Sequence, residues 1–437
     1  MQDITRRKFI GGVGAAGVGV AAAACTPRAN PPAVAAESPP RQDDSVIVNP
    51  APGSGPSGSD PNPYSNPLQA SSSQILVYVN LFGANDGLNT VVPYTNSTYI
   101  AARGPVAIGE AQGVMPIGES MGLHPALSSL KTHAWDTGKL AIIRAVGYPN
   151  TDRSHFRSTD IWHTGRPDIQ TPTGWGGLWL DSVNDSLGAV AMTSELPRFL
   201  RGAQSTAICV GGDSVAMQVS AGQRSSYESE TRRDDSDPYW AAAWRKSGAD
   251  LFRADSVLTP VLTGAFPQGS KLAPLNTMIG RQLGSVLKMI ANPSIPTRVY
   301  YVNLYNFDTH FNQLSAHAAL LQQLGDALGA FQHDLGLVTG GEKVTTLIAS
   351  EFGRRLNANS NFGTDHGSAN VAFVMGGKVN GGFHGSPEDL TTLDPVGDPY
   401  SKIDLRSILS TLLARQLGID PTPILGGSFP QINFMAA

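Results

Sequence analysis

Acidic, imidazole and hydroxyl side chains flank the apolar segments of this sequence, at the points where those segments begin or end. The group consists of Asp86, Ser154, His155, Asp308, His310, Glu351, Asp365 and His366. Carboxylate oxygens and imidazole nitrogens bind divalent metal ions, and nearby glycines let the backbone approach closely. We therefore predict a site for one or two divalent ions, such as Zn, Mn, Mg or Ca. The predicted metal ligands are Asp86, Asp308, His310, Glu351, Asp365 and His366.

Ser154 begins a segment with helical character and has two interpretations. A serine at this position commonly caps a helix by accepting a backbone N–H. Beside a metal ion and a helix N-terminus its hydroxyl is also more easily deprotonated, because both centres stabilise the alkoxide. We predict that Ser154, His155 and Arg157 carry the catalysis. Arg157 and Arg354 can either clamp an anionic group or lie on the surface as charges.

The elements that must position these residues are apolar runs of strand length. They span residues 75–81, 140–146, 297–304, 344–349 and 369–375. Between the third and fourth runs, apolar residues from Leu314 to Leu335 recur at steps of three and four, which predicts a helix with His317 packed in the core. Strands that alternate with helices predict a doubly wound, mainly parallel α/β sheet, with ligands at the carboxyl ends of its strands. Residues 180–275 are polar, and we expect an irregular insertion there.

Composition excludes several classes of protein. The 437 residues include 31 Lys+Arg and 35 Asp+Glu, so the formal net charge is only -4 and a nucleic-acid-binding surface is not expected. Two cysteines, Cys25 and Cys209, cannot form a disulfide framework or a thiolate metal cluster. A metal ion must therefore bind oxygen or imidazole ligands.

The N-terminus has the character of an export signal. Arg6 and Arg7 precede Phe9, Ile10 and a mildly apolar run up to Ala24, which is typical of a twin-arginine signal peptide over residues 1–25. The run is too weakly apolar for a transmembrane helix. We predict export by the twin-arginine machinery to the periplasm or cell envelope.

The end of that signal allows two modes of processing. Residues 22–25, Ala-Ala-Ala-Cys, resemble a lipoprotein site in which Cys25 becomes lipidated and anchors the protein to the membrane. Cleavage after Ala24 would instead release a soluble protein. Residues 26–74 are rich in Pro, Ser, Ala and Gly, and this composition predicts a disordered tether. The globular part is expected to span residues 75–437.

Five motifs of the globular part resemble one exported family, named domain of unknown function 1501. They lie at residues 80–94, 146–157, 307–310, 350–354 and 363–367. The resemblance extends from about Ile75 to about Phe429. The family is assigned to the alkaline phosphatase and sulfatase superfamily, which implies an α/β sheet with a two-metal site. It further implies that Asp86 is a metal ligand on the first strand, that Ser154 is the nucleophile, and that Asp308 and His310 are ligands.

The later ligands can be aligned in two ways. Asp365 and His366 can be the Asp-His pair of the superfamily, with His384 as the last ligand. Alternatively, Glu351 occupies the position of that Asp, Phe352 replaces the His, and His366 is the last histidine. The positions of the strands favour the second alignment.

The function expected from these residues is metal-dependent hydrolysis of a phosphate or sulfate ester, such as an anionic small molecule or a glycan ester. The metal would polarise the ester and Ser154 would attack it. A formylglycine sulfatase is disfavoured, because Ser154-His-Phe-Arg157 lacks the Ser-x-Pro-x-Arg pattern. The alternative is a non-catalytic binding or assembly protein of the cell envelope that keeps the fold.

Overall fold

The computed structural model describes residues 72–212, 215, 221–231 and 238–435. The predicted signal peptide, Cys25 and all but the last residues of the predicted tether lie outside these ranges. None of the described helices is both long and apolar enough to cross a membrane.

Nine strands of the described residues form the central sheet, in the order β13-β5-β12-β9-β1-β8-β6-β7, with β14 also paired to β5. Their bounds are β1 (Ile75–Leu81), β5 (Leu140–Gly147), β6 (Ala189–Ala191), β7 (Ile208–Cys209), β8 (Val299–Leu304), β9 (Val344–Ser350), β12 (Asn370–Gly376), β13 (Gly382–His384) and β14 (Ile403–Asp404). Neighbouring strands are parallel, except that β12 runs antiparallel to both β5 and β9. The predicted mainly parallel sheet is confirmed.

Two smaller sheets accompany the central one. A hairpin of β10 (Arg354–Ala358) and β11 (Thr364–His366) joins β9 to β12. A three-stranded sheet consists of β2 (Val91–Val92), β4 (Met121–Leu123) and β3 (Met115–Gly118). The hairpin matters for function, because it carries two of the residues predicted to bind a metal.

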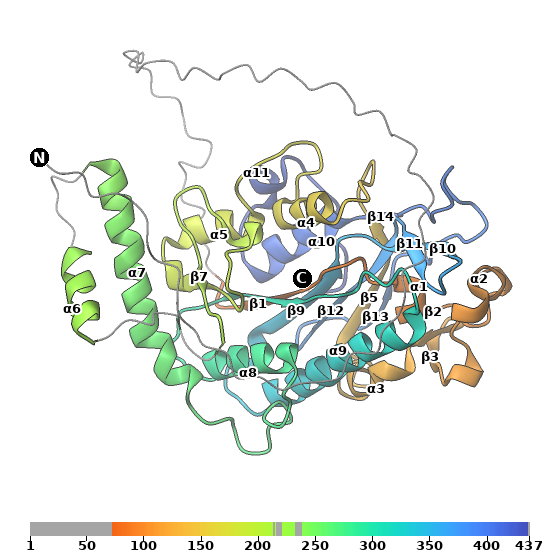
Figure 1. The fold of residues 1–437 in the computed structure, drawn as a ribbon, viewed down its shortest axis with the longest axis horizontal. Coiled ribbons are helices and arrows are strands. Elements are labelled where there is room, and N and C mark those ends of the chain that lie inside the picture. Colours follow the sequence, from red (N-terminus) through yellow and green to blue (C-terminus); the bar gives the residue numbers. More distant parts are fainter. Residues whose placement is uncertain (1–71, 213–214, 216–220, 232–237, 436–437) are drawn as a thin grey trace, which may run out of the picture. The chain divides into compact units, whose positions relative to one another are not determined.

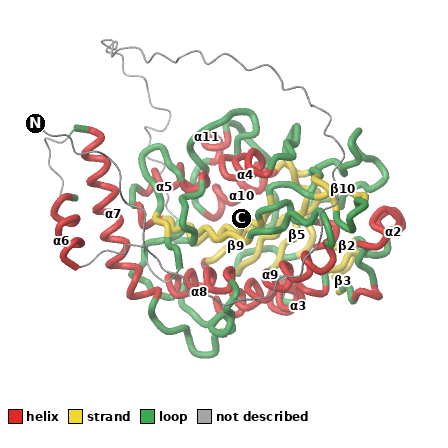
Figure 2. Tube along the Cα trace, viewed as in Figure 1, coloured by secondary structure: helices red, strands yellow, loops and turns green. Residues whose placement is uncertain are grey.

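Helices cover both faces of the central sheet (Figures 1 and 2). The helices of the described residues are α1 (Gly87–Thr90), α2 (Ser97–Arg103), α3 (Ser128–Leu130), α4 (His155–Thr164), α5 (Trp175–Val183), α6 (Ala221–Glu230), α7 (Tyr239–Leu262), α8 (Met278–Ile290), α9 (Gln313–Leu335), α10 (Leu405–Thr411) and α11 (Pro421–Leu425). One hydrophobic core lies under α3, α8 and α9, and a second lies under α4, α5, α10 and α11. The doubly wound arrangement is therefore confirmed.

Strand β1 shows why the sheet has two cores. Side chains alternate between the faces of a strand, so Val77 and Val79 pack in the first core while Leu76 and Tyr78 pack in the second. A strand buried on both faces reads as a continuous apolar run, which is the pattern of residues 75–81. The predicted helix over residues 314–335 is α9, and His317 is buried on it as expected.

The range expected to be an irregular insertion, residues 180–275, is partly regular. Strands β6 and β7 extend the central sheet at one edge, and the 24-residue helix α7 follows them. These strands have only three and two residues, which is too short to produce a recognisable periodic pattern.

Candidate metal centre

The carboxyl ends of the central parallel strands bring the predicted site residues to one edge of the sheet. Asp308 follows β8, and His155 begins α4 after β5. Because β12 runs in the opposite direction, its first residue lies at this same edge, and His366 comes shortly before it. Gly83, after β1, has a φ of 119°, and a Cβ there would lie 2.5 Å from the Asp308 nitrogen. Glycine is therefore required where the segment after β8 packs on the segment after β1.

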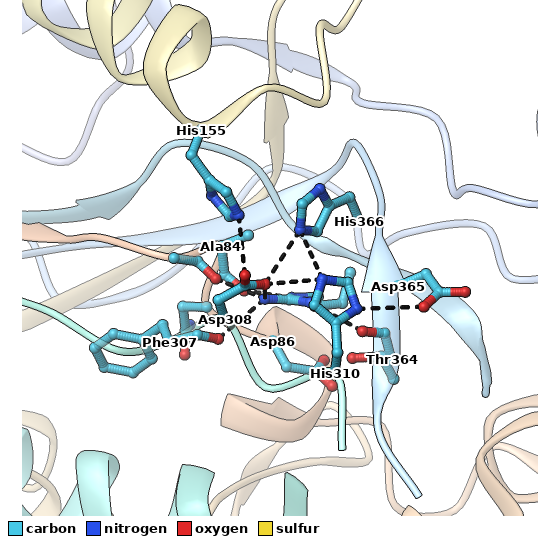
Figure 3. A network of polar contacts seen from close by, with 12 residues as sticks. Ala84, Asp86, His155, Phe307, Asp308, His310, Thr364, Asp365 and His366 are labelled. Carbon is cyan, nitrogen blue, oxygen red and sulfur yellow. Dashed lines mark hydrogen bonds and ion pairs between the residues drawn. The ribbon is translucent and has the colours of Figure 1, made fainter. Parts of the chain in front are cut away.

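Three imidazole rings converge on the carboxylate of Asp308 (Figure 3). The Nε2 atom of His310 lies 2.9 Å from Asp308 Oδ1, and that of His366 lies 3.1 Å from the same oxygen. His155 Nε2 lies 3.5 Å from Asp308 Oδ2. We call Asp308, His155, His310 and His366 the histidine cluster. It joins residues that follow β5, follow β8 and precede β12.

A hydrogen-bond acceptor stands behind each of the three rings. His155 Nδ1 lies 2.7 Å from Glu351 Oε1, and His310 Nδ1 lies 3.3 Å from Asp365 Oδ1. His366 Nδ1 lies 3.0 Å from the carbonyl oxygen of Arg153. Since these partners can only accept, each Nδ1 is expected to carry a proton, and a ring that is neutral then directs the lone pair of its Nε2 towards Asp308.

These lone pairs fit a divalent cation. The Nε2 atoms of His310 and His366 face each other at 2.9 Å, a distance that requires either a proton or a metal ion between the two nitrogens. His155 Nε2 is buried and has no hydrogen-bond partner. One ligand atom each from His155, Asp308 and His366 lies within 4.8 Å of the others. Ligands about 2.0–2.2 Å from a shared tetrahedral ion would lie roughly 3.3–3.6 Å apart, close to the arrangement seen here.

The pKa shifts of Asp308 and His366 suit metal binding. Burial alone would raise the pKa of Asp308, but hydrogen bonds from Arg354 and His366 and the positive charge of Arg354 lower it to about 2. Burial lowers the pKa of His366, so this imidazole is more readily neutral. The hydrogen bond to Glu351 raises the pKa of His155, so this ring is more readily protonated, and a metal ion would have to displace its Nε2 proton. An anionic carboxylate and a neutral imidazole are the forms that bind metal ions.

Two carboxylates predicted as ligands lie behind the imidazole rings, on the side away from Asp308. Glu351 is buried, and its Oε1 accepts from Gly83 N at 2.8 Å as well as from His155. Its Oε2 accepts from Ser350 Oγ at 2.8 Å. Asp365 accepts from Asn359 Nδ2 at 3.1 Å and from His310, and its side chain is 51% exposed. Both carboxylates therefore orient imidazoles in this structure. His384, the last ligand of the first alignment, lies outside the cluster and contacts the Asn380 carbonyl.

Asp86, the predicted first-strand ligand, is not part of the histidine cluster. Its carboxylate is fully buried and forms an ion pair with Arg103, which α2 supplies. Burial alone would raise the pKa of Asp86, and the guanidinium more than offsets this, so the pKa is lowered. At Asp86, which the sequence predicted to be a metal ligand, the chain itself thus supplies the counter-charge.

The two arginines considered as anion clamps bind backbone carbonyls. Arg354 is fully buried and donates to the carbonyl oxygens of Gly83, Ala84, Phe307 and Thr364, and to Asp308 Oδ1 at 2.8 Å. Arg157 donates to the carbonyl oxygens of Pro167 and Ile169. Arg354 therefore ties together the segments that follow β1 and β8, rather than facing a ligand.

Ser154 is the N-cap residue of α4, next to His155, and it is exposed. Its side chain makes no capping hydrogen bond, while its backbone N–H donates to Asp152 Oδ1 at 2.8 Å. Among the described residues, no hydrogen bond ties its hydroxyl to the histidine cluster. Its predicted role as nucleophile stays a prediction.

Aromatic side chains border the cluster on the side of β8. The Phe82 ring lies 5.7 Å from the His155 ring, 6.4 Å from Phe156 and 6.0 Å from Tyr305, between ring centroids. Phe156 is 80% exposed. Tyr305 also lines a cavity of about 340 Å³ with Met192, Arg281 and Gln282. A ligand at the cluster can thus reach a partly apolar strip and a cavity at the same sheet edge.

Sequence reasoning missed Arg153 and Arg103. The carbonyl of Arg153 holds His366, and its side chain is paired with Asp398 and Asp394. It lies inside the 146–157 motif, next to Ser154, so the motif offered a signal. Arg103 had none, because nothing in the local pattern of α2 indicates a buried partner for Asp86.

Comparisons with known proteins agree with the predicted family. The model of the family described as "protein of unknown function (DUF1501)" matches residues 289–429. The predicted resemblance is confirmed over that part of the chain. No curated protein matches this sequence.

Several solved structures resemble the fold at low sequence identity. One is a protein in the alkaline phosphatase superfamily from Vibrio parahaemolyticus, with a TM-score of 0.39 and 10% identity, covering 83% of this chain and 71% of that one. A 2-O GAG sulfatase gives a TM-score of 0.39 and 10% identity, over 81% of this chain and 75% of that one. The phosphonate monoester hydrolase of Agrobacterium radiobacter gives a TM-score of 0.32 and 9% identity, over 82% of this chain and 78% of that one.

Proposed function

We propose that the protein is a metal-dependent hydrolase of phosphate or sulfate esters, with the histidine cluster as its metal centre. The observation that carries the proposal is the common orientation of three imidazoles, whose Nδ1 protons are held from behind while their Nε2 atoms face Asp308. The buried His155 Nε2 makes no hydrogen bond and lies 3.5 Å from Asp308 Oδ2, so a metal ion bound between these two atoms would satisfy it.

The residues of the chain then have distinct roles. A divalent ion, when bound, would supply Lewis-acid chemistry to an ester oxygen. Asp308 and the three imidazoles would hold it, and Glu351 would fix the ring of His155. The first N–H groups of α4 have no partner within the helix, and they would bind an anionic ester oxygen. Ser154, beside them, is the proposed nucleophile.

The surroundings of the cluster suggest how the organic part of the ester binds. Phe82, Phe156 and Tyr305 offer aromatic faces beside His155, and the cavity lies beyond Tyr305. Aromatic faces bind apolar or ring-shaped groups. We assign the alcohol side of the ester to this strip and the scissile group to the cluster.

The decisive experiment combines metal analysis with turnover. Purified protein should contain a divalent metal, lose thermal stability with a chelator, and hydrolyse an aryl phosphate or aryl sulfate. Ser154→Ala should abolish turnover and keep the metal, whereas His366→Ala should lose both. His384→Ala, which removes a histidine of β13 outside the cluster, is the matched control. A metal-free protein of full stability would contradict the proposal and favour the non-catalytic alternative.

Export by the twin-arginine route remains part of the proposal. Arg6→Lys combined with Arg7→Lys should leave the precursor in the cytoplasm, and unchanged export would contradict the route. If Cys25 is lipidated, Cys25→Ala should release the processed protein from membranes. A wild-type protein that is wholly soluble after processing would contradict the anchor.

A further inference from the structure

We infer that this chain binds a single divalent ion. The buried guanidinium groups of Arg103 and Arg354 occupy the place that a second metal ion would take, and they supply its positive charge. The inference rests on the proposed metal centre and departs from the two-metal site that the superfamily resemblance implies. It concerns Asp86, Arg103, Gln313 and Arg354, which lie beside the histidine cluster in the interior of the protein.

The carboxylate of Asp86 has no free position for a metal. Its Oδ1 accepts from Arg103 Nη2 at 2.9 Å and from Asn89 N at 3.2 Å. Its Oδ2 accepts from Arg103 Nη1 and from Gln313 Nε2, the latter at 2.5 Å. A carboxylate offers about four acceptor positions. All of them are filled by donors of the chain, and the residue is fully buried.

The donors to Asp86 are themselves fixed. Gln313 Oε1 accepts from Thr364 Oγ1 at 2.6 Å, so its amide N–H can only point to Asp86. Arg103 Nη2 also donates to the carbonyl oxygen of Arg355 at 3.1 Å, and its side chain has no exposure. A metal ion at Asp86 would have to displace this guanidinium and leave it buried without its partner, which is strongly unfavourable.

Arg354 closes the approach from the other side. It donates to Asp308 Oδ1 and to the carbonyls of Gly83 and Ala84, which belong to the segment that leads to Asp86. A second ion that shared Asp308 with the first would have to take the position of this cation. Asp308 therefore offers its remaining lone pairs to one ion only.

The formal charges agree with one ion. Four carboxylates, those of Asp86, Asp308, Glu351 and Asp365, lie in or around the cluster with two guanidinium groups. The difference of two negative charges is balanced by one divalent cation, and a second cation would leave an excess of positive charge at the cluster.

The test is the metal stoichiometry of the whole processed protein. The protein is loaded with excess Mn²⁺, desalted and analysed by elemental mass spectrometry and by electron paramagnetic resonance. We expect one ion per chain and the spectrum of an isolated ion. Two ions per chain with exchange-coupled spectra would overturn the inference and leave the proposed function intact, whereas no bound ion would overturn the proposed function itself.

Two isosteric variants locate the ion. Asp86→Asn should still bind one ion per chain, and Asp308→Asn should bind none. Loss of an ion in Asp86→Asn that remains folded by circular dichroism would show that Asp86 is a ligand, and would also overturn the inference. If Asp86→Asn does not fold, the stoichiometry of the wild-type protein still decides the question.

Discussion

Asp86 and Asp308 occupy corresponding places after two neighbouring central strands, β1 and β8, yet the chain treats them differently. Asp86 is fully buried and its oxygens are filled by Arg103, Gln313 and a backbone N–H. Asp308 is 45% exposed and faces the Nε2 atoms of His155, His310 and His366. A carboxylate at a strand end is thus either held in a structural ion pair, as Asp86 is, or left open to the proposed metal ion, as Asp308 is, depending on whether the chain itself supplies the donors.

We expect the largest effect from a substitution of Asp308, the carboxylate that the chain leaves open. Asp308→Asn removes the only anionic ligand of the cluster, so we expect loss of bound metal and of turnover, with the fold retained. Elemental analysis and an ester hydrolysis assay measure both. Asp86→Asn is the control and should keep the metal. Equal metal loss in both variants would erase the distinction.

For the buried pair of Asp86 and Arg103, we expect the largest effect on the free energy of unfolding. Arg103→Met leaves the Asp86 carboxylate buried without its partner, and breaking a buried ion pair costs about 3–5 kcal/mol. Urea unfolding of metal-free protein measures this free energy. Arg166→Met, which removes an arginine from a partly exposed ion pair with Asp168, is the control and should cost less than about 1 kcal/mol. A similarly small cost for Arg103→Met would contradict the structural role of the pair.

A substitution of Glu351 tests the carboxylates that orient the proposed metal ligands. Glu351→Gln keeps the size of the side chain and weakens its hold on the Nδ1 proton of His155, so metal affinity should fall about 10–100-fold. Competition with a chelator measures this affinity. Asp365→Asn removes a more exposed carboxylate and should have a smaller effect. If Glu351 were a direct ligand, the metal would be lost altogether.

Three histidines outside the cluster are buried, and their burial makes the stability of the protein depend on pH. Burial lowers the pKa of His124 to about 4, and that of His163 and His317 to about 3, from a usual value of 6.5. The unfolded chain therefore binds more protons below about pH 6.5. The stability that these neutral rings contribute is present above that pH and falls as the pH drops towards 4 and 3, by roughly 1 kcal/mol per pH unit for each ring.

Unfolding free energies between pH 8 and pH 4 check this slope. His163→Phe removes one of the three rings and should make the slope shallower by one proton. An unchanged slope in His163→Phe would show that this ring is not neutral in the folded protein.

We expect the smallest effect at Tyr305, in the aromatic strip beside the cluster. Tyr305→Ala removes an aromatic face between Phe82 and the cavity, so the KM for an ester of a ring-shaped alcohol should rise several-fold while kcat changes little. Steady-state kinetics with an aryl ester and with a methyl ester separate the two. A methyl ester equally affected would indicate that Tyr305 acts on the cluster, not on the alcohol group.

Much of the fold was predictable from apolar runs, and so was the approach of His155, Asp308, His310 and His366 to one another at one edge of the sheet. The runs at residues 75–81 and 344–349 coincide with β1 and β9 to within a residue, and the stripe from Leu314 coincides with α9. The direction of β12 was not predictable, because an apolar run carries no information about whether its neighbours are parallel.

Sequence reasoning could not sort ligands from supporting residues. Asp86 and Asp308 have similar local contexts, and their difference arises from Arg103 and Gln313, which lie on α2 and α9. Glu351 and His155 are 196 positions apart, and their pairing depends on how β5 and β9 are spaced in the sheet. Side-chain partners at such separations follow from tertiary packing rather than from any local pattern.

The central place of β1 has a consequence for biosynthesis. This strand is the first of the sheet to be made, yet both of its neighbours come late: Asn80 bonds to Asn303, 223 positions away, and Gly83 bonds to Glu351, 268 positions away. At translation rates of about 5–20 residues per second, β1 would wait on the order of ten seconds to a minute for its partners. During that interval an apolar segment is exposed to aggregation, so we expect nascent chains to depend on a chaperone until β9 has been synthesised.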